Sequence, residues 1–383
     1  ISFLFSDEIK LQQQVDLIHN KVSGNEDVDT TSEVSSEKKL ISKEKLYSRC
    51  HIPDISQVAN ICEKLDILFY GVKSADRFSA AVTDKLVANK LSGKSFQSCV
   101  DCNNVKFSLL VEKAKELGCD YISTGHYAKV VENQKTGHFY IHAANDLEHD
   151  QSYLLSRLPQ ESLKKLILPL SETRLKEVEK IMQMIGLKLP FISSEDIDCF
   201  QGDLRLPSLV EVCSAASLLR KGNFFLEHEN LISSEHRGIH HFEVGQTNLN
   251  LGSDSKASSK LIVNKIVPTN GTVIVSPIKD IYFDRLLINK VILDPMRDIS
   301  KPFQGFVKIG IKSDMQACHV YFKNFNTIMV VFKKIFVGII TTGTTIAIYN
   351  KIGISGKIIT SGEVQVCGVV DKGELTNYIG RVD

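Results

Sequence analysis

Three cysteines are the residues of this sequence best suited to chemistry. Cys99 and Cys102 form a C-x-x-C motif, and Cys199 stands alone between Asp198 and Phe200. A thiolate is nucleophilic, and its sulfur can be capped reversibly as a persulfide. Such thiols could carry or transfer sulfur. The alternative is that they are buried packing residues, since free cysteines are usually found in apolar surroundings.

The C-x-x-C motif has two further interpretations. A tetrahedral zinc site needs a second pair of ligands at comparable spacing, and the sequence offers no such pair. A thioredoxin-type redox pair would follow a strand and start a helix, and this condition is met only in part. No metal site is therefore expected here.

The elements around the cysteine pair are those of a parallel α/β sheet. Apolar residues recur at helical spacing from Val105 to Leu117, Gly118 ends this segment, and 120–124 predicts a short buried strand. Gly125-His126 then stands where a parallel strand delivers its loop to a ligand crevice. The alternative for this pair is a tight turn that carries a surface histidine.

The remaining chain is predicted to contain more helices and then many strands. Hydrophobic spacing predicts helices at 54–65, 76–88, 158–187 (with a turn near Pro169) and 208–219, and a strand at 67–72. Residues 22–45 are polar and are predicted to form a disordered insertion. From Phe242 onward, short apolar runs separated by turn residues favour a small antiparallel barrel.

Composition bounds the class of protein. With 383 residues the chain is long enough for two or three domains. A net charge of +1 gives no global reason to expect a polyanionic partner, so a nucleic-acid surface would be a local patch. Nine scattered cysteines argue for free thiols in a reducing compartment, the cytoplasm or an organellar matrix. No apolar run is long enough to span a bilayer, and no membrane partner is expected.

Taken in order, the motifs resemble those of the bacterial tRNA 2-thiouridylase family, MnmA, within the PP-loop ATP-pyrophosphatase superfamily. The resemblance runs from about Cys50 to the C-terminus. It rests on C-V-D-C-N-N-V-K-F from Cys99, T-G-H-Y-A-K from Thr124, Asp150-Gln151-Ser152-Tyr153-Leu154, the single Cys199, and Gly238-Ile239-His240 followed by Val244-Gly245-Gln246.

The family implies an α/β fold in three parts. Residues 1–205 would form a parallel-sheet PP-loop catalytic domain of the adenine nucleotide hydrolase type, 206–276 a central linking domain, and 277–383 an antiparallel β-barrel. Ile1–Phe5 matches the family's second strand, so the PP-loop itself is expected upstream of residue 1. Ser23–Asp27 echoes that loop only faintly, because the second glycine is missing and phosphates approach the backbone closely only where side chains are absent.

The resemblance also implies an activity, namely ATP-dependent transfer of sulfur from a Cys199 persulfide to C2 of the wobble uridine, position 34, of tRNA. Cys99 would resolve the reaction and leave a Cys99–Cys199 disulfide, while Cys102 would be structural. A persulfide-donating protein would supply the sulfur, and Gly125 would contact Mg-bound ATP. The residues expected to contact tRNA are His126, His149, Asp150, Gln151 and Lys312. Asp150 has a second interpretation, as the N-cap of a helix.

Several positions depart from the family pattern through loss of cations. The family's K-I-R-Y-R becomes Lys308–Lys312, G-Q-R-K-G-L becomes Gly245–Asn250, and His149 replaces a usual lysine. Each loss should weaken RNA binding and flatten its salt dependence. One alternative is therefore a catalytically inactive tRNA-binding relic that does not bind ATP. Another is a sulfur relay through Cys99 and Cys199 that is indifferent to nucleotide.

Overall fold

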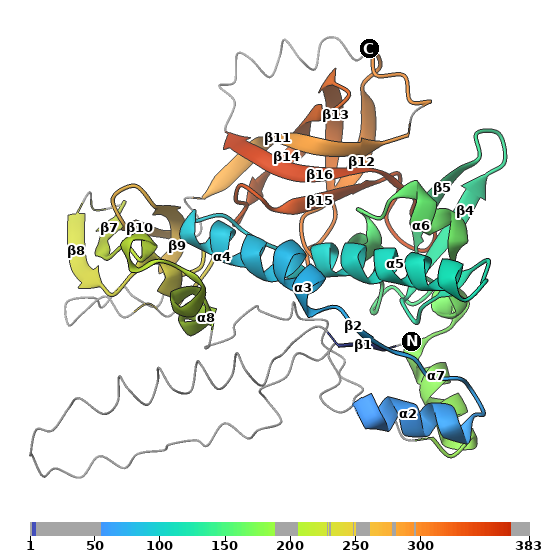
Figure 1. Cartoon of the computed structure of the whole chain (residues 1–383). Helices are drawn as coiled ribbons and strands as arrows, with labels where there is room; N and C mark the ends of the chain where they lie inside the picture. The colour runs from blue at the N-terminus through green and yellow to red at the C-terminus, as the bar shows by residue number, and fades with distance from the viewer. Residues whose placement is uncertain are drawn as a thin grey trace, which may run out of the picture.

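The computed structural model describes most of the chain in three connected groups of elements (Figure 1). These are an α/β part, a four-stranded sheet and a closed six-stranded barrel. The described residues are 2–4, 55–187, 206–227, 229, 231–247, 249, 261–277, 281–294 and 296–368. Cys199 and the predicted insertion at 22–45 lie outside them. No helix among the described residues combines the length and apolar character needed to cross a membrane.

Helix α5 (Ser98–Glu116) is central to the α/β part and lies along one side of the barrel (Figure 1). It is buried on two sides, which is why its apolar residues do not form one stripe. Val100, Phe107, Val111 and Ala114 pack into one core, whereas Cys102, Val105 and Leu109 pack into another. The helix ends at Gly118 (φ +69°), where the Cys119 N–H donates to Ala114 O at 2.8 Å, as predicted.

Two pairs of strands in the α/β part are parallel, which confirms the predicted class. β3 (Ile122–Ser123) pairs with β6 (Leu166–Ile167), and β1 (Ser2–Leu4) pairs with β2 (Gly71–Lys73). The predicted strand at 67–72 was wrong over most of its length. Helix α2 (Ile55–Lys64) ends in a turn in which the Ile67 N–H donates to Cys62 O at 2.8 Å, so the chain becomes extended only later.

Two predicted helices are divided in the structure. Residues 75–91 form α3 (Ala75–Phe78), a π-helical segment at 79–83 and α4 (Asp84–Leu91). The predicted helix at 158–187 consists of α6 (Gln160–Lys165), strand β6, a 3-10 turn at Pro169–Glu172 and α7 (Leu175–Met184). Pro169 disfavours a helical conformation at the residue before it, and Leu166 pairs with Ile122 in the sheet.

A β-hairpin follows the Gly125-His126 loop and was not predicted. β4 (Ala128–Asn133) pairs with β5 (His138–Ala143). The hairpin contacts the barrel, where the Ala143 N–H donates to Gly356 O at 2.9 Å.

The four-stranded sheet has the order β8-β7-β10-β9 and lies beside α8 (Leu206–Cys213). Its strands are β7 (Gly222–Leu226), β8 (Leu231–His236), β9 (Leu261–Val267) and β10 (Thr272–Pro277). β9 and β10 follow Phe242 but belong to this sheet, so the prediction that the runs from Phe242 onward form a barrel was wrong for these two strands. Gly222 is needed because a Cβ at this position would clash with the Gly271 carbonyl.

The C-terminal part is a closed antiparallel barrel, as predicted, with the order β11-β14-β13-β12-β15-β16. Its strands are β11 (Tyr282–Leu293), β12 (Phe303–Lys308), β13 (Gln316–Asn324), β14 (Thr327–Val337), β15 (Thr345–Tyr349) and β16 (Ile358–Gly368). β15 is buried on both faces. Ile346 and Ile348 fill the barrel, while Ala347 and Tyr349 join the core of α5. The barrel and the α/β part therefore share a hydrophobic core.

Candidate active site

The two cysteines of the C-x-x-C motif have different surroundings. Cys99 lies in the first turn of α5 and is partly buried against the core that α5 shares with the barrel. Cys102 is buried beside Phe78, Val82 and Val105 in the second core. Neither forms a disulfide with a described residue. Cys99 is thus the more accessible nucleophile of the pair, and Cys102 fills a packing position.

The segment that leads into Cys99 is held by two loops of the barrel. The Ser95 N–H donates to Thr342 O at 3.1 Å, and the Gln97 side-chain amide donates to Ile309 O at 3.4 Å. Gly343 has φ +89°, and a Cβ there would lie 2.6 Å from Ser95 O. Only a glycine allows the barrel backbone to approach this closely. The barrel therefore sets the position of the residues just before Cys99.

Tyr153 is the buried centre of this junction. Its hydroxyl lies 2.8 Å from Thr345 O and 3.4 Å from Ile309 O, and it also contacts the Gln97 side-chain oxygen. Its ring packs in the shared core and is 1% exposed. One side chain thus contacts the segment before Cys99 and two parts of the barrel.

Asp150 lies in a second polar cluster between the α/β part and the barrel. Its carboxylate accepts hydrogen bonds from the Ala144 N–H (3.0 Å) and from the Ser152 hydroxyl (2.7 Å). That hydroxyl also lies 2.9 Å from the Tyr349 hydroxyl, and Lys308 Nζ is 4.0 Å from the carboxylate. The side chain of Asp150 is only 5% exposed. Its predicted contact with tRNA stays a prediction, and in the structure its oxygens serve internal bonds.

Burial governs the charges of this cluster. It raises the pKa of Asp150, although the bonds from Ser152 and Ala144 and the charge of Lys308 oppose the shift. It lowers the pKa of Lys308, against the attraction of Asp150. The pKa of Tyr349 is held well above its usual value by burial and by the charge of Asp150. Desolvation outweighs the ion pair at both partners, as expected for two buried charges about 4 Å apart.

Gln151 joins two of the predicted motifs. Its backbone N–H donates to Tyr127 O at 2.7 Å, and its side-chain oxygen accepts the Tyr127 N–H at 3.0 Å. These bonds fix the loop that carries Gly125 and His126 beside residues 149–151. His149 in turn contacts Asp146 Oδ2 through Nδ1 at 3.0 Å. The structure thus brings together five predicted site residues, Gly125, His126, His149, Asp150 and Gln151.

His126 is held as a neutral ring. Its Nδ1 lies 2.9 Å from the Thr124 hydroxyl, and its ring packs on Phe107 with 5.7 Å between the ring centroids. Burial, followed by the positive charge of Lys106, lowers the pKa of His126 to about 4. At neutral pH this side chain therefore offers hydrogen bonds rather than a positive charge.

Gly125 leaves room at the end of β3. A Cβ at this position would meet only Leu170 Cδ1, at an ordinary 3.7 Å, and Gly125 is exposed. Packing among the described residues therefore does not require a glycine here. The open backbone fits the close approach of a flat nucleotide base to a strand end.

Two exposed lysines flank the segment before Cys99. Lys312 was predicted from the sequence, and it lies in the barrel loop whose Ile309 and Gly310 N–H groups donate to Ser313 Oγ, at 3.0 Å each. Lys94 was not predicted and lies beside Gly343. Within the described ranges neither lysine forms an ion pair, so both charges are available to a phosphate.

Gln97, Tyr153, Lys308 and Tyr349 join the α/β part to the barrel, and these roles were not predicted from the sequence. Tyr153 belongs to the D-Q-S-Y-L motif, and this motif is the feature of the sequence that could have indicated its importance. Tyr349 lies 197 residues from its partner Ser152, and local patterns do not report such a pairing. Cys199 lies outside the described residues.

Comparison with known proteins shows the family of the chain. Residues 21–202 match the family model described as the tRNA methyl transferase HUP domain. The tRNA-specific 2-thiouridylase MnmA of Clostridium perfringens is 30% identical over 262 residues, which cover 68% of this chain and 71% of that protein. The protein of the same name from Clostridioides difficile is 25% identical over 324 residues, 84% and 85% of the two chains. That of Halothermothrix orenii is 26% identical over 316 residues, 82% and 85%. The chain belongs to the tRNA-specific 2-thiouridylase family.

Proposed function

We propose that this chain is a sulfurtransferase that converts the wobble uridine of tRNA, position 34, to 2-thiouridine. Membership of the 2-thiouridylase family supports the reaction class. The structural observation that carries the proposal is the place of Cys99, partly buried at the start of α5 and held by the barrel. The division into catalytic (1–205), linking (206–276) and barrel (277–383) domains is part of this proposal.

The chemistry needs two thiols. The outer sulfur of a Cys199 persulfide attacks C2 of the uridine, and the C2 oxygen leaves. The Cys99 thiolate then attacks the Cys199 Sγ, which breaks the sulfur–sulfur bond, leaves its electron pair on the transferred sulfur, and forms a Cys99–Cys199 disulfide. A thiol reductant restores both cysteines. A persulfide-carrying donor protein reloads Cys199.

ATP, bound with Mg²⁺, supplies the adenylyl group that makes the C2 oxygen a leaving group. Gly125 would border the nucleotide base, and the space above its backbone fits that role. Phe107, which packs on His126, follows Cys99 by eight residues, which is about 12 Å along the helix. The target base would therefore lie along α5, between the nucleotide loop and Cys99.

The tRNA would contact the protein at the loops around this stretch of α5. Lys312 and Lys94 would contact phosphates, and the neutral His126 would donate or accept a hydrogen bond. His149 and Gln151 border the same loop through Tyr127. Anticodon bases are single-stranded and can be splayed out, which suits recognition by side chains of this kind. A reducing compartment such as the cytoplasm would supply the thiol reductant that this reaction cycle needs.

The test is an assay of 2-thiouridine by nucleoside mass spectrometry, with tRNA, ATP, Mg²⁺ and a persulfide source. Cys99→Ser and Cys199→Ser should each reduce product to background, because each removes a sulfur that the reaction needs. Cys119→Ser, which removes an exposed free thiol elsewhere, should leave the rate unchanged. Product that survives both active-site substitutions would contradict the mechanism.

The same assay separates the alternatives. tRNA that binds without any thiolation would identify an inactive tRNA-binding relic. Persulfide transfer that is indifferent to ATP would identify a sulfur relay.

A further inference from the structure

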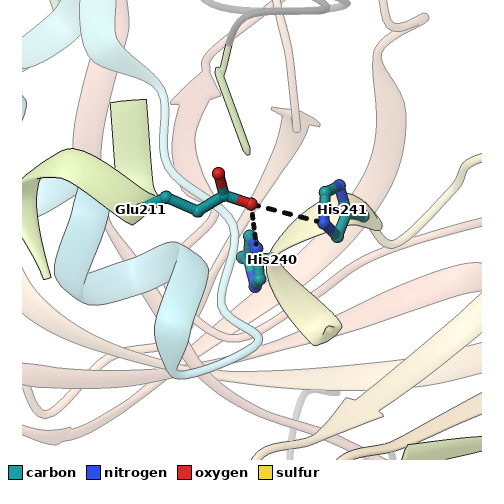
Figure 2. A group of neighbouring side chains, drawn as sticks. All are labelled: Glu211, His240 and His241. Carbon is teal, nitrogen blue, oxygen red and sulfur yellow. Dashed lines mark hydrogen bonds and ion pairs between the residues drawn. The ribbon is translucent and has the colours of Figure 1, made fainter. Parts of the chain in front are cut away.

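A cluster of metal-ligating side chains lies outside the candidate active site. Glu211 projects from α8, and His240 and His241 project from the 3-10 turn Ile239–His241 (Figure 2). Glu211 Oε1 lies 3.1 Å from His240 Nε2 and 3.6 Å from His241 Nε2. One ligand atom from each residue lies within 4.8 Å of the other two. One carboxylate oxygen faces both rings (Figure 2).

Two hydrophobic cores hold the cluster in place. On α8, Leu209 and Val210 pack against Leu86 and Val87 of α4. The turn is anchored by Ile239, which is fully buried in the core of the four-stranded sheet and whose N–H donates to Arg220 O at 3.0 Å. The ligands therefore project from rigid elements, which lowers the entropy lost when an ion is bound.

Gly238 makes room for the His240 ring. A Cβ at Gly238 would lie 2.6 Å from His240 Nδ1, so a larger residue would displace the imidazole. Nδ1 of His240 is buried and makes no hydrogen bond with the described residues. The polar contact of this ring is thus at Nε2, the atom that faces Glu211.

The spacing suits a four-coordinate ion. With bonds of about 2.0–2.1 Å, two ligand atoms of a tetrahedral zinc site are about 3.3–3.4 Å apart. The observed separations of 3.1 and 3.6 Å lie on either side of that value. Two imidazoles and one carboxylate are a known zinc ligand set that leaves a fourth position for water or another group.

The exposure of the three side chains allows an ion to enter. The side chain of His240 is 2% exposed, whereas those of His241 and Glu211 are 33% and 32% exposed. An ion can therefore reach the cluster from the His241 side.

We propose that Glu211, His240 and His241 bind one Zn²⁺ ion, with a fourth position open to solvent, and that the ion fastens α8 to the turn at 239–241. The site differs from the C-x-x-C motif, for which the sequence predicts no metal. The proposed site has two nitrogen ligands and one oxygen ligand, which also suit Co²⁺, so Co²⁺ should be able to replace Zn²⁺ there.

The test uses the full chain and two variants, Glu211→Gln and His241→Gln. Glutamine at 211 keeps the shape and an oxygen that can accept a hydrogen bond from His240, but it removes the carboxylate. Both positions are partly exposed, so folding should survive, and circular dichroism checks it. Glu235→Gln on β8 and His319→Gln on β13 are the matched controls.

Co²⁺ titration should show one visible-absorbing site without thiolate charge-transfer bands, which separates it from cysteine binding. Each variant should lower the Co²⁺ affinity of that site by at least 10- to 100-fold, since this is the typical loss when even an outer-shell partner of a metal ligand is removed. The control variants should keep the Co²⁺ affinity of the unchanged chain. Zn²⁺ should raise the melting temperature of the unchanged chain but not of either variant. Retention of the thiolate-free site in either folded variant, or its absence from the unchanged chain, would overturn the proposal.

Discussion

The hydroxyl of Tyr153 donates a hydrogen bond across 2.8 Å to the carbonyl oxygen of Thr345, the first residue of β15. The donor belongs to the motif segment of the α/β part and the acceptor to the barrel. The same hydroxyl contacts Gln97, two residues before Cys99. The barrel is therefore coupled to the position of the candidate nucleophile through a buried polar contact.

Replacing Tyr153 with phenylalanine should test this coupling. Tyr153→Phe keeps the ring in its core but removes the donor to Thr345, so unfolding in urea should become about 1–2 kcal/mol easier. Thiolation should slow as well, because the segment before Cys99 loses a fixed contact. Tyr282→Phe, at a half-exposed tyrosine on β11, should change stability by less than about 0.5 kcal/mol. Equal effects of the two substitutions would show that the hydroxyl of Tyr153 has no special role.

The close approach of Gly343 to Ser95 offers a second test. Gly343→Ala places a methyl group 2.6 Å from Ser95 O at φ +89°, so the barrel loop and the segment before Cys99 must move apart. Gly353→Ala has a similar φ of +96° but meets nothing within 4 Å. Both variants should be less stable to unfolding by roughly 1 kcal/mol, because alanine is strained at positive φ. Only Gly343→Ala should also lose most of the thiolation activity. Full activity in Gly343→Ala would show that this contact does not position Cys99.

Asp150 and Lys308 are buried together, with side chains 5% and 11% exposed. Asp150→Asn should destabilise the chain by roughly 2–4 kcal/mol, because it leaves Lys308 buried without its counter-charge. Adding Lys308→Met to this variant should recover part of the lost stability. Urea unfolding of the unchanged chain, the two single variants and the double variant gives the coupling energy of the pair. Strict additivity of the two substitutions would mean that the pair does not interact.

His126 should produce a defined pH dependence of stability. Its pKa is about 4 in the folded chain and about 6.5 when unfolded, so between these values the unfolded state binds more protons. The contribution of His126 to the free energy of unfolding is fully present above pH 6.5 and is lost as the pH falls toward 4. Over this range the free energy of unfolding should fall by up to roughly 1.4 kcal/mol per pH unit. Urea unfolding of His126→Gln should lack this contribution, whereas His138→Gln should retain it. An unchanged slope in His126→Gln would contradict the burial of the neutral ring.

The exposed Lys312 should act through charge alone. Lys312→Gln should weaken tRNA binding and reduce the slope of log K against log salt by about 0.7–0.9, the value for one phosphate contact. Lys334→Gln, at an exposed lysine on β14, serves as the control. The measurement is fluorescence anisotropy of labelled tRNA between low and physiological salt. The same slope in both variants would remove Lys312 from the tRNA surface.

Features that depend on neighbouring residues could be predicted from the sequence. The helical spacing around Phe107 and the stop at Gly118 specify α5 and its end, since both arise within a few turns of one helix. Alternating apolar residues and turn signals likewise indicated most of the barrel strands. The short motifs around Cys99 and Gly125 were enough to suggest the family, because their order along the chain is itself specific.

Tertiary packing decided the rest. Tyr153 meets partners that are 56, 156 and 192 residues away, and Glu211 meets His240 across 29 residues. The two-residue strand β6 forms because Leu166 pairs with Ile122 in the sheet, although the local sequence predicts a helix there. Local propensity is worth only tenths of a kcal/mol per residue, roughly, so burial against distant elements overrides it. The same burial decides charge, because the depressed pKa of His126 follows from the elements packed around its ring and not from its place in the sequence.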